Sequence, residues 1–403
     1  MRYILSLAGS AVLLAGSAAA ECAIENSVPL RSLTNSFEAW KVVTDEMGEC
    51  GNFTAVLDNE FRQKQAPAFA ASPPLYQIGG VADGDFTPLI QQNLVRPLDD
   101  LVERYGDQLR PNQFIQIDGQ IMAIAMMINN QHLMYRADIL ADLGLDVPTT
   151  YDELLTAAAI IEEAGVVDYP LGATYMAGWN LAKELTNMYL AMGGSLFNED
   201  DTPSIANETG IAAIEMMKAV TEYLDPEYLV SDSTYVQQQF QQGKIAMANF
   251  WASRAAAVMN PEESEYAYHI KMAAAPAAVE GGPPAATVSW NGIVLPRNLD
   301  PEAAEIAFQV ALEGIDAETA REHPDAAVWL IDGYEPTPAA EGAIATAGAG
   351  AAPMPASVPY GLMHDAVGNN LAEFLTGRLD AMATLERIEE AYLVSAREAG
   401  VVD

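Results

Sequence analysis

The chain has 403 residues, half of them hydrophobic, which is enough for a buried core and predicts about two domains. Its formal net charge is −37, from 56 acidic and 19 basic residues. This charge excludes nucleic acid as an expected partner, because phosphate binding requires clustered Lys and Arg. It also disfavours a strongly anionic ligand, although one buried Arg could still hold one; a solvated acidic surface suited to salty surroundings accounts for it.

The first 20 residues have the pattern of an export signal. Arg2 supplies a positive charge, the apolar stretch 4–15 follows, and small residues lead up to a cleavage position after Ala20. The apolar stretch is shorter than the roughly 20 residues that a membrane-spanning helix requires. We therefore expect a soluble mature protein in the periplasm. Glu21 argues against lipid attachment at Cys22, since a lipoprotein signal requires a small residue directly before the cysteine.

Cys22 and Cys50 are the only cysteines, and both lie in the expected mature chain. In an oxidising compartment such a pair predicts one disulfide. It would close a loop of about 29 residues and stabilise the fold by about 3–4 kcal/mol in the loop-entropy treatment. Two free thiols are the alternative, and a redox role lacks the usual C-x-x-C spacing.

Short apolar runs alternate with amphipathic stretches along the whole chain, which predicts an α/β fold. In the first part, strands are expected at 28–33, 53–58 and 74–78 and, buried on both faces, at 121–127; helices are expected at 37–48, 86–92 and 99–105. Further along, helices are expected at 137–143, 151–164, 181–192, 210–223 and 237–242, and strands at 171–174, 245–249 and 293–296. Thr150 and Glu153 form a predicted capping box, and Gly144 and Gly165 mark helix ends.

Two stretches rich in Ala, Gly and Pro, 273–286 and 336–359, are expected to be irregular connections. Gly348 and Gly350 in the second do not follow a strand and open a helix, as a dinucleotide-binding loop would require. The acidic segment 198–201 lacks the full pattern of a calcium loop and is expected to be a hydrophilic turn.

Signatures of enzymes are missing from the sequence. The four histidines have no metal-ligand spacing, and H-E-x-x-H, G-x-S-x-G and G-x-x-x-x-G-K-[ST] are all absent. Carboxylates are too numerous for a catalytic pair to be identified. The sequence therefore predicts neither catalysis nor a cofactor or metal.

Tryptophans next to short polar side chains follow or precede several predicted strands. In QQQFQQGKIAMANFW, Asn249 and Trp251 end a strand; Trp290 stands between Ser289 and Asn291, and Trp179 precedes Asn180. Each indole could simply pack in a core. The repeated pattern favours a site in which aromatic faces and amides bind a neutral polyhydroxy solute.

Four segments resemble the family 1 extracellular solute-binding proteins of ABC importers, the maltose-binding-like group. Residues 240–247 (FQQGKIAM), followed by a Trp, match F-x-x-G-K-x-A-M, and 144–153 (GLDVPTTYDE) resembles G-L-D-V-P-x-T-W-D-E. Residues 118–136 resemble the D-G-K … L-Y-Y-N strand pair, and 376–392 resemble the closing helix. The similarity extends from about residue 28 to the C-terminus.

The resemblance implies a two-lobed periplasmic-binding-protein fold of type II, with a hinge crossed three times. The crossings would lie near Asn129, in 277–286 and near 333–338. The implied domains are a signal peptide at 1–20, an N-terminal lobe at 21–129 and 283–333, and a C-terminal lobe at 130–282 and 334–403.

By position, the family's ligand contacts would fall at strand ends, in the hinge strand and in the turn before residue 293. They are Asn35, Phe37, Asn59, Glu60, Gln77, Gly79, Gly80, Asn129, Asn130, Tyr175, Trp179, Trp251, Ser289, Trp290, Asn291 and Tyr360. Three departures stand out: Ala125 replaces a usual Pro, Arg136 replaces an Asn, and Trp290-Asn291 replaces two glycines. A bulky Trp290 in that turn would favour a mono- or disaccharide or a polyol over a long oligosaccharide.

The implied function is a monomeric periplasmic receptor that delivers a neutral carbohydrate to the membrane permease of an ABC transporter. One alternative keeps the fold but binds an amine, a sulfonated sugar or a glycerol phosphate, with Arg31, Arg62 or Arg254 as the residue for an anion. The other is an exported carbohydrate-active enzyme, which the survey of motifs disfavours.

Overall fold

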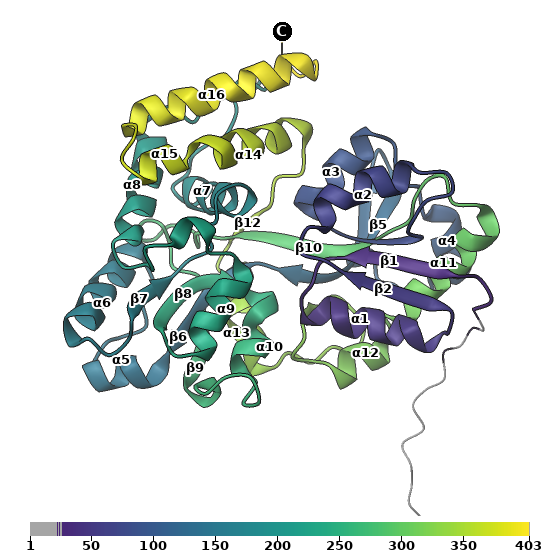
Figure 1. Cartoon of the computed structure of the whole chain (residues 1–403), viewed down its shortest axis with the longest axis horizontal. Helices are drawn as coiled ribbons and strands as arrows, with labels where there is room; N and C mark the ends of the chain where they lie inside the picture. The colour runs from purple at the N-terminus through teal and green to yellow at the C-terminus, as the bar shows by residue number, and fades with distance from the viewer. Residues whose placement is uncertain (1–21, 23, 25, 403) are drawn as a thin grey trace, which may run out of the picture.

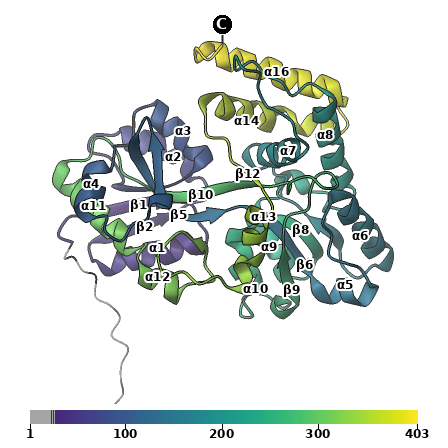
Figure 2. The same ribbon diagram turned by 180° about the vertical axis from the view of Figure 1, so that it is seen from behind.

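The computed structural model describes residues 22, 24 and 26–402. The expected export signal and its cleavage position lie outside the described residues. Two α/β lobes lie side by side and are joined by several passages of the chain, among them the long strand β10 (Figure 1, Figure 2). We call them the large-sheet lobe and the small-sheet lobe, after the sheet on which each is built.

The large-sheet lobe contains an eight-stranded sheet with the order β11-β5-β10-β3-β1-β2, with β4 paired to β5 and β12 paired to β10. Its strands are β1 (Leu30–Thr34), β2 (Phe53–Leu57), β3 (Ile78–Ala82), β4 (Phe114–Ile117), β5 (Gln120–Asn129), β10 (Thr287–Val294), β11 (Val328–Trp329) and β12 (Ala352–Pro353). The accompanying helices are α1 (Glu38–Glu49), α2 (Phe61–Ala70), α3 (Asp83–Gln91), α4 (Asp99–Tyr105), α11 (Pro301–Glu313) and α12 (Ala317–Glu322). Strands β1, β2 and β3 are parallel, and β10 runs antiparallel between β3 and β5.

The small-sheet lobe contains a four-stranded sheet with the order β7-β8-β6-β9. Its strands are β6 (Gln131–Arg136), β7 (Tyr169–Gly172), β8 (Ile245–Trp251) and β9 (Ile270–Ala273). Its helices are α5 (Ala137–Leu143), α6 (Tyr151–Ala164), α7 (Trp179–Ala191), α8 (Glu208–Thr221), α9 (Ser233–Gln241), α10 (Ala255–Met259), α13 (Glu341–Gly348), α14 (Val358–Asn370), α15 (Ala372–Leu375) and α16 (Ala381–Glu398). Helices α14, α15 and α16 pack above α7 and α8 (Figure 1).

Local sequence signals set the ends of several elements. Helix α6 begins where the Thr150 hydroxyl oxygen accepts a hydrogen bond from the Glu153 N–H at 3.2 Å. It ends at Gly165, whose φ of 61° is a left-handed conformation that glycine adopts without steric cost. Gly243, with φ 67°, similarly ends the α9 segment before β8 begins. These signals account for the agreement between the predicted and observed ends of α6 and for the start of β8.

The chain passes between the lobes at the places where regular structure is interrupted. It enters the small-sheet lobe between β5 and β6, around Asn130, and returns through 274–286 to β10. After β11 it crosses again through 330–337 towards α13. The boundaries at 21–129, 283–333, 130–282 and 334–403 remain a prediction.

Some predicted elements were wrong. The strand expected at 74–78 lies at Ile78–Ala82, since β3 includes the glycines that were thought to follow it. The turn expected before residue 293 is part of β10. The connection expected at 336–359 contains helix α13, which packs against β6 and β9, and α2 was not predicted at all because Pro67 interrupts its pattern.

Each lobe has its own apolar core, and the disulfide holds the N-terminal segment to the large-sheet lobe. Trp40 and Phe308 are almost fully buried in the large-sheet lobe, and Tyr189 is almost fully buried in the small-sheet lobe. The predicted Cys22–Cys50 disulfide is confirmed, and Cys50 immediately follows α1. Among the described residues, no helix is long and apolar enough to cross a membrane.

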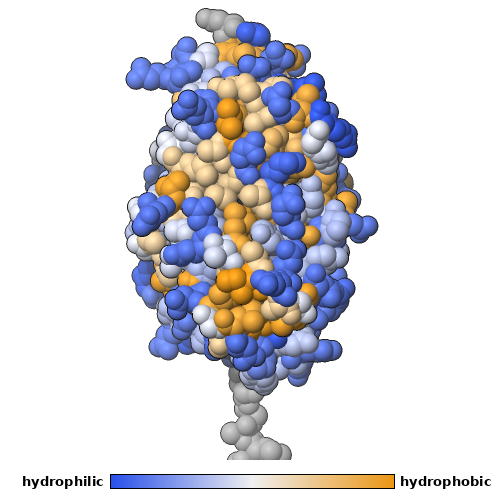
Figure 3. All heavy atoms as spheres, turned by 90° about the vertical axis from the view of Figure 1, so that its left-hand side faces the viewer, coloured by the Kyte–Doolittle hydropathy of each residue, from blue (hydrophilic) through white to orange (hydrophobic). Residues whose placement is uncertain are grey.

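The outer face of the small-sheet lobe mixes charged and apolar side chains (Figure 3). Helices α6 and α8 border a groove there with the connection near Val279. Its lining includes the apolar Leu155 and Met216 and the acidic Asp152 and Glu280. Acidic and apolar side chains thus lie side by side on this face.

Candidate functional site

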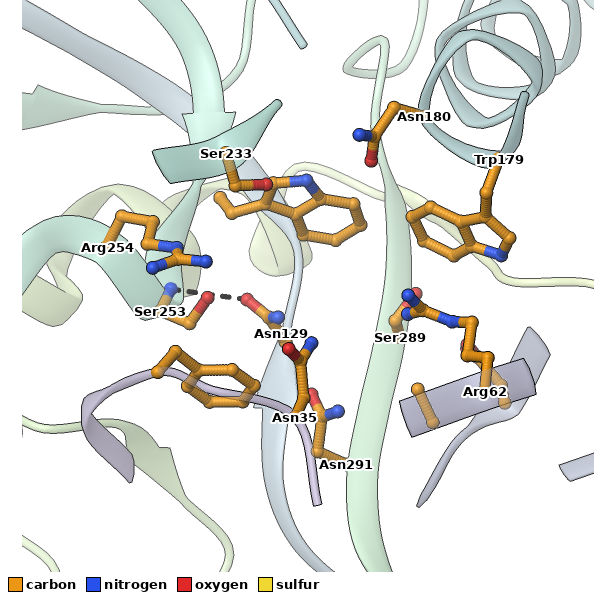
Figure 4. Close-up of a pocket in the computed structure, with 14 residues that line it drawn as sticks. Asn35, Arg62, Asn129, Trp179, Asn180, Ser233, Ser253, Arg254, Ser289 and Asn291 are labelled. Carbon is orange, nitrogen blue, oxygen red and sulfur yellow. Dashed lines mark hydrogen bonds between the residues drawn. The ribbon is translucent and has the colours of Figure 1, made fainter. Parts of the chain in front are cut away.

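A cavity lies between the two lobes, and we call it the interlobe cavity. It contains about 530 Å³ of space, part of it open to solvent. Its lining residues come from both lobes: Asn35, Phe37, Arg62, Ala82, Asp83, Asn129, Ser289 and Asn291 on the large-sheet side, and Trp179, Asn180, Ser233, Trp251, Ser253 and Arg254 on the small-sheet side. Figure 4 shows these side chains facing a common space.

Strand ends supply most of this lining. Asn35 follows β1, Asp83 follows β3 and begins α3, and Asn129 ends β5. From the other lobe, Trp251 ends β8 and Arg254 lies in the short 3₁₀ turn after it. Ligand sites in open α/β sheets typically form at the carboxyl ends of strands, where loops leave the sheet. The position of the cavity therefore follows from the topology.

Alternation along β10 decides which of its side chains reach the cavity. Ser289 and Asn291 line it, whereas the intervening Trp290 packs edge-on against Phe86 at a ring separation of 5.6 Å. Successive side chains of a strand point to opposite faces, so a strand cannot present three neighbours to one site. The prediction that Trp290 narrows the site is therefore wrong.

Two indole rings meet at the cavity wall. The centroids of Trp179 and Trp251 are 6.1 Å apart, with an angle of 29° between the ring planes. The Arg62 guanidinium lies 4.5 Å from the ring centre of Trp179, and the Lys183 ammonium lies 5.4 Å from that of Trp251. Trp251 is only 6% exposed. Much of the indole surface is thus already in contact with protein groups.

The Arg62 cation is neutralised within its own lobe. Its Nε donates a short hydrogen bond to the buried carboxylate of Asp85 on α3. Asp85 also accepts a hydrogen bond from the backbone N–H of Ala82. Arg62 therefore brings hydrogen-bond donors to the cavity without adding an unbalanced charge.

Asp83 is a buried carboxylate, with 2% of its surface exposed. One oxygen accepts a hydrogen bond from the Gly84 N–H, while Oδ2 has no hydrogen-bond partner among the described residues. Burial raises the pKa of Asp83 to about 6, and the positive charge of Lys183 and the hydrogen bonds from the Gly84 N–H and the Ser289 hydroxyl oppose part of that rise. At neutral pH the cavity wall thus carries an ionised acceptor with unused capacity.

Lys183, on α7, lies behind this wall and is 1% exposed. Its ammonium donates to the hydroxyl oxygen of Ser289 at 3.1 Å and also to that of Thr287. Burial lowers the pKa of Lys183 to about 8, opposed by the negative charges of Asp83 and Glu184. Because Ser289 accepts from Lys183, its own O–H can donate, and its interaction with the carboxylate of Asp83 favours the ionised form of that group.

Arg254 is the contrasting cation. Its Nη1 donates to the Gln237 side-chain oxygen at 3.2 Å, and no carboxylate of the described residues lies within ion-pair distance. Burial lowers the pKa of Arg254 to about 10, and the more distant Asp232 partly offsets that effect. A guanidinium has five N–H donors, so most of those on Arg254 remain available to a solute.

Seven of the predicted contact residues do line the interlobe cavity: Asn35, Phe37, Asn129, Trp179, Trp251, Ser289 and Asn291. Asn129 is held in place because its side-chain oxygen accepts from the Ser253 N–H at 3.2 Å. These residues come from five separate stretches of sequence. Their assignment as ligand contacts remains a proposal.

The other nine predicted residues lie elsewhere: Asn59, Glu60, Gln77, Gly79, Gly80, Asn130, Tyr175, Trp290 and Tyr360. Asn59 and Glu60 are exposed beside the edge strand β2, and Gln77 binds the backbone at Arg31 and Pro74.

The remaining positions are buried for structural reasons. Gly79 and Gly80 are inside β3, where an added Cβ would lie 2.4 Å from the Phe69 ring and 2.7 Å from the Trp40 ring respectively. The Asn130 amide donates to the Ala343 carbonyl at 3.0 Å. Tyr175 and Tyr360 are each 3% exposed within the core of the small-sheet lobe.

Sequence reasoning did not assign seven lining residues to the site: Arg62, Ala82, Asp83, Asn180, Ser233, Ser253 and Arg254. From the sequence, Arg62 and Arg254 are named only as residues that would bind an anionic solute. Ser253 and Arg254 directly follow a predicted strand end and could have been found from that signal. Asp83 was missed because β3 was placed four residues too early.

The described residues contain one group of side chains close enough together to hold a metal ion, formed by Glu46, Glu322 and His323. None of the three lines the interlobe cavity. The cavity itself offers amides, hydroxyls, one carboxylate, two guanidinium groups, two indoles and the phenyl ring of Phe37. This combination is suited to holding a small hydroxylated molecule by hydrogen bonds and ring contacts.

Comparisons with known proteins agree with this geometry. A family model described as bacterial extracellular solute-binding protein matches residues 52–311. No curated protein matches the sequence significantly.

Several solved structures have the same two-lobed fold. An ABC transporter solute-binding protein from Agrobacterium radiobacter K84, in complex with ribitol, has a TM-score of 0.79 at 20% identity, covering 92% of this chain and 100% of that one. One from Agrobacterium vitis S4 with bound D-mannitol has a TM-score of 0.75 at 18% identity, covering 92% and 99%. A maltose-bound T. maritima protein has a TM-score of 0.76 at 17% identity, covering 91% and 98%. The predicted α/β two-lobed fold is confirmed.

Proposed function

The chain belongs to the bacterial extracellular solute-binding proteins, and from this we propose that it is the substrate-binding receptor of an ABC importer. It captures a neutral carbohydrate, either a mono- or disaccharide or a polyol, in the interlobe cavity. Similar folds have been solved with ribitol, mannitol and maltose bound, which supports a hydroxylated solute. The captured solute is then delivered to a membrane permease.

The observation that carries this proposal is the coexistence of Asp83 and Arg254 in one cavity. Asp83 presents an acceptor and Arg254 presents donors, and neither is satisfied by an opposite charge in direct contact. A hydroxyl group both donates and accepts hydrogen bonds, so a neutral polyhydroxy solute can satisfy both residues. Leaving either group buried without a partner would cost about 1–3 kcal/mol or more.

An anionic solute is the second candidate, because Arg62 and Arg254 both line the cavity. However, Arg62 already pairs with Asp85, and an anion that binds Arg254 would lie in the same cavity as the carboxylate of Asp83. An amine would face the reverse conflict with Arg254. The balance of charge therefore favours a neutral solute.

Binding would act through closure of the lobes. Both lobes contribute to the cavity lining, so the full set of contacts exists only when the lobes are close together. A solute that binds the closed form more tightly shifts the population towards it. We place the hinge in the three connections near Asn129, at 277–286 and at 333–338, and the lobes within the boundaries predicted from the sequence.

The cellular setting follows from the same proposal. The receptor works in the periplasm as a monomer after cleavage behind Ala20, and the closed form docks on the permease. Micromolar binding corresponds to about 8 kcal/mol, which several hydrogen bonds and two indole contacts can provide. The role is binding, with no turnover of the solute.

A thermal-shift screen of the purified mature protein against sugars, polyols, amines and sugar acids tests the proposal, with hits measured by calorimetry. We expect at least one neutral sugar or polyol to bind with a Kd in the micromolar range or below. Exclusive binding of amines or acids would overturn the neutral assignment, and turnover of a glycan would overturn the role as a receptor.

A further inference from the structure

Resting on the proposed function, we infer that the solute is an open-chain polyol whose hydroxyls are shared between Asp83 of the large-sheet lobe and Arg254 of the small-sheet lobe. The inference narrows the sugars and polyols above to one chemical class. It also assigns specificity to Asp83, which the sequence did not place in the site, and to Arg254, which is named from the sequence only as a residue for an anion. Three features of the interlobe cavity support it.

The first feature is the state of the aromatic wall. A cyclic sugar usually presents a flat patch of C–H groups, which needs a free aromatic face of similar size. Here Trp179 and Trp251 lie against each other, and each also has a cation over its ring, Arg62 at 4.5 Å and Lys183 at 5.4 Å. Trp251 and Phe37, the third aromatic residue of the lining, are only 6% and 8% exposed, and Trp179 is partly buried. Less flat surface is therefore left for a pyranose ring than three free rings would offer.

The second feature is the polar character of the remaining lining. Amides, hydroxyls and charged groups make up ten of its members: Asn35, Arg62, Asp83, Asn129, Asn180, Ser233, Ser253, Arg254, Ser289 and Asn291. They surround the space from several sides, as Figure 4 shows for those it labels. An alditol has a hydroxyl on every carbon and free rotation along its chain. It can therefore direct hydroxyls to donors and acceptors on different sides, which a rigid ring does less completely.

The third feature is the distribution of unused hydrogen-bonding capacity between the lobes. The carboxylate of Asp83 accepts from the Gly84 N–H and interacts with the Ser289 hydroxyl, and its Oδ2 keeps further acceptor capacity. Across the cavity, Arg254 donates one hydrogen bond, to the Gln237 amide oxygen. A solute with hydroxyls at both ends bridges these groups, and in doing so it links the two lobes.

Matched pairs of solutes provide the test, measured by calorimetry on the mature protein at pH 7.5. D-Glucitol is compared with D-glucose, and D-mannitol with D-mannose, since each pair differs chiefly in ring formation. Ribitol, maltose and D-gluconate complete the panel. We expect at least one alditol to bind at least tenfold more tightly than its cyclic partner and than gluconate.

The outcomes separate this inference from the proposed function. If glucose, mannose or maltose binds at least as tightly as the tightest-binding alditol, the open-chain assignment is overturned. The proposed role as a receptor for a neutral carbohydrate is then unaffected. Tightest binding of gluconate overturns both the open-chain assignment and the neutral solute. Failure of the whole panel to bind counts against the proposed function itself.

Variants test the two named residues. Asp83→Asn and Arg254→Gln should each weaken binding of the best alditol at least tenfold, because each removes a charged partner of a hydroxyl. Arg31→Gln is the matched control: Arg31 is an exposed arginine that lies over Tyr76 at 4.8 Å and away from the cavity. The affinity of the Arg31→Gln variant for the same alditol should equal the wild-type value.

Thermal unfolding of each variant shows whether it is folded. A folded Asp83→Asn or Arg254→Gln protein with wild-type affinity would overturn the role of that residue. For a variant that does not fold, Asp83→Glu and Arg254→Lys take its place. These retain charge but move it, and are expected to weaken alditol binding several-fold; unchanged affinity in them would count against the assignment in the same way.

Discussion

Trp251 is the single side chain whose removal should affect the interlobe cavity most. It ends β8, packs on Trp179 and lines the cavity. We expect Trp251→Ala to weaken solute binding at least tenfold, measured by calorimetry, because part of the cavity wall and the packing that positions Trp179 are lost. Trp290→Phe is the control, since Trp290 contacts Phe86 outside the cavity; equal losses in the two variants would defeat the assignment of Trp251.

Asp83 makes solute binding depend on pH. Burial raises its pKa to about 6, so the carboxylate is ionised at pH 7.5 and largely protonated at pH 5, where it loses acceptor capacity. The charged groups that act on it are Lys183 on α7 and Asp85 on its own helix. Lys183 is mostly protonated across this range because its pKa is about 8. Affinity measured by calorimetry should therefore fall from pH 7.5 to pH 5.

The variant Asp83→Asn provides the control for this pH dependence. It cannot titrate, so its weaker affinity should vary little between pH 7.5 and pH 5. If wild type and variant lose affinity in parallel, a different group is responsible for the pH effect.

At the residue level, the sequence predicted side chains that directly follow a recognisable strand. Asn35 and Trp251 are in this class, because their strands end close to where hydrophobicity indicates. Asp83 was missed through the shifted position of β3, and Trp290 was assigned to the wrong side because its segment was taken for a turn. A strand that is off by one position, or not seen as a strand, reverses the face of every side chain on it.

At the scale of the elements, β10 has little space for added volume at Gly292. A Cβ there would lie 2.3 Å from the Ile124 carbonyl oxygen and 2.8 Å from the Ala125 Cα of the neighbouring β5. Both are backbone atoms in a paired strand, so they cannot move aside cheaply. We expect Gly292→Ala to lower the free energy of unfolding by about 1–3 kcal/mol in urea denaturation.

Gly361→Ala is the matched control for that substitution. Gly361 lies in α14, and a Cβ there meets no atom within 4 Å. Alanine is favoured over glycine inside a helix by roughly 0.5–1 kcal/mol, so this variant should be as stable as the wild type or slightly more stable. Equal destabilisation by the two changes would contradict the role of backbone contact at Gly292.

The Cys22–Cys50 disulfide should contribute to the stability of the large-sheet lobe. The bond joins residues 28 apart and restricts the unfolded chain, an effect of about 3–4 kcal/mol by loop entropy. Urea unfolding with and without reductant measures it, and the double variant Cys22→Ser/Cys50→Ser should match the reduced protein. An unchanged unfolding midpoint after complete reduction would show that the loop contributes little.

Element prediction succeeded where capping residues and hydrophobic period agreed. Helix α6 has Thr150 before it and Gly165 after it, and its ends were predicted to the residue. Helix α2 was not predicted because Pro67 lies inside it. Only the end of β10 was predicted, as part of the strand expected at 293–296, because Asn291-Gly292 has the composition of a turn. In both cases tertiary packing outweighs local preference.

For the whole molecule, closure around the solute is a prediction of its own. The radius of gyration from solution scattering should decrease when a saturating alditol is added to the wild-type protein, because contacts from both lobes favour the closed form. At the same alditol concentration, the radius of gyration of the Trp251→Ala variant should decrease less, since a smaller fraction of its molecules has solute bound. An identical radius in the presence and absence of bound solute would argue against closure.

The overall architecture was predicted far better than the details of the cavity. Segments such as 240–247 and 144–153 resemble motifs of the family and so predict its fold, whatever the solute. The cavity depends instead on which side chains from distant segments meet, as Asp83, Lys183 and Ser289 do through three different elements. Such meetings leave no local pattern in a single sequence.

The contact between Trp179 and Trp251 also equips the protein with a built-in optical reporter. Only five tryptophans are present, and two of them share one wall of the cavity, so a molecule entering beside them changes the surroundings of a large part of the total emission. Trp40 and Trp329, buried in the other lobe, supply a steady background against which that change stands out. Intrinsic fluorescence can therefore follow solute capture in real time, without a label.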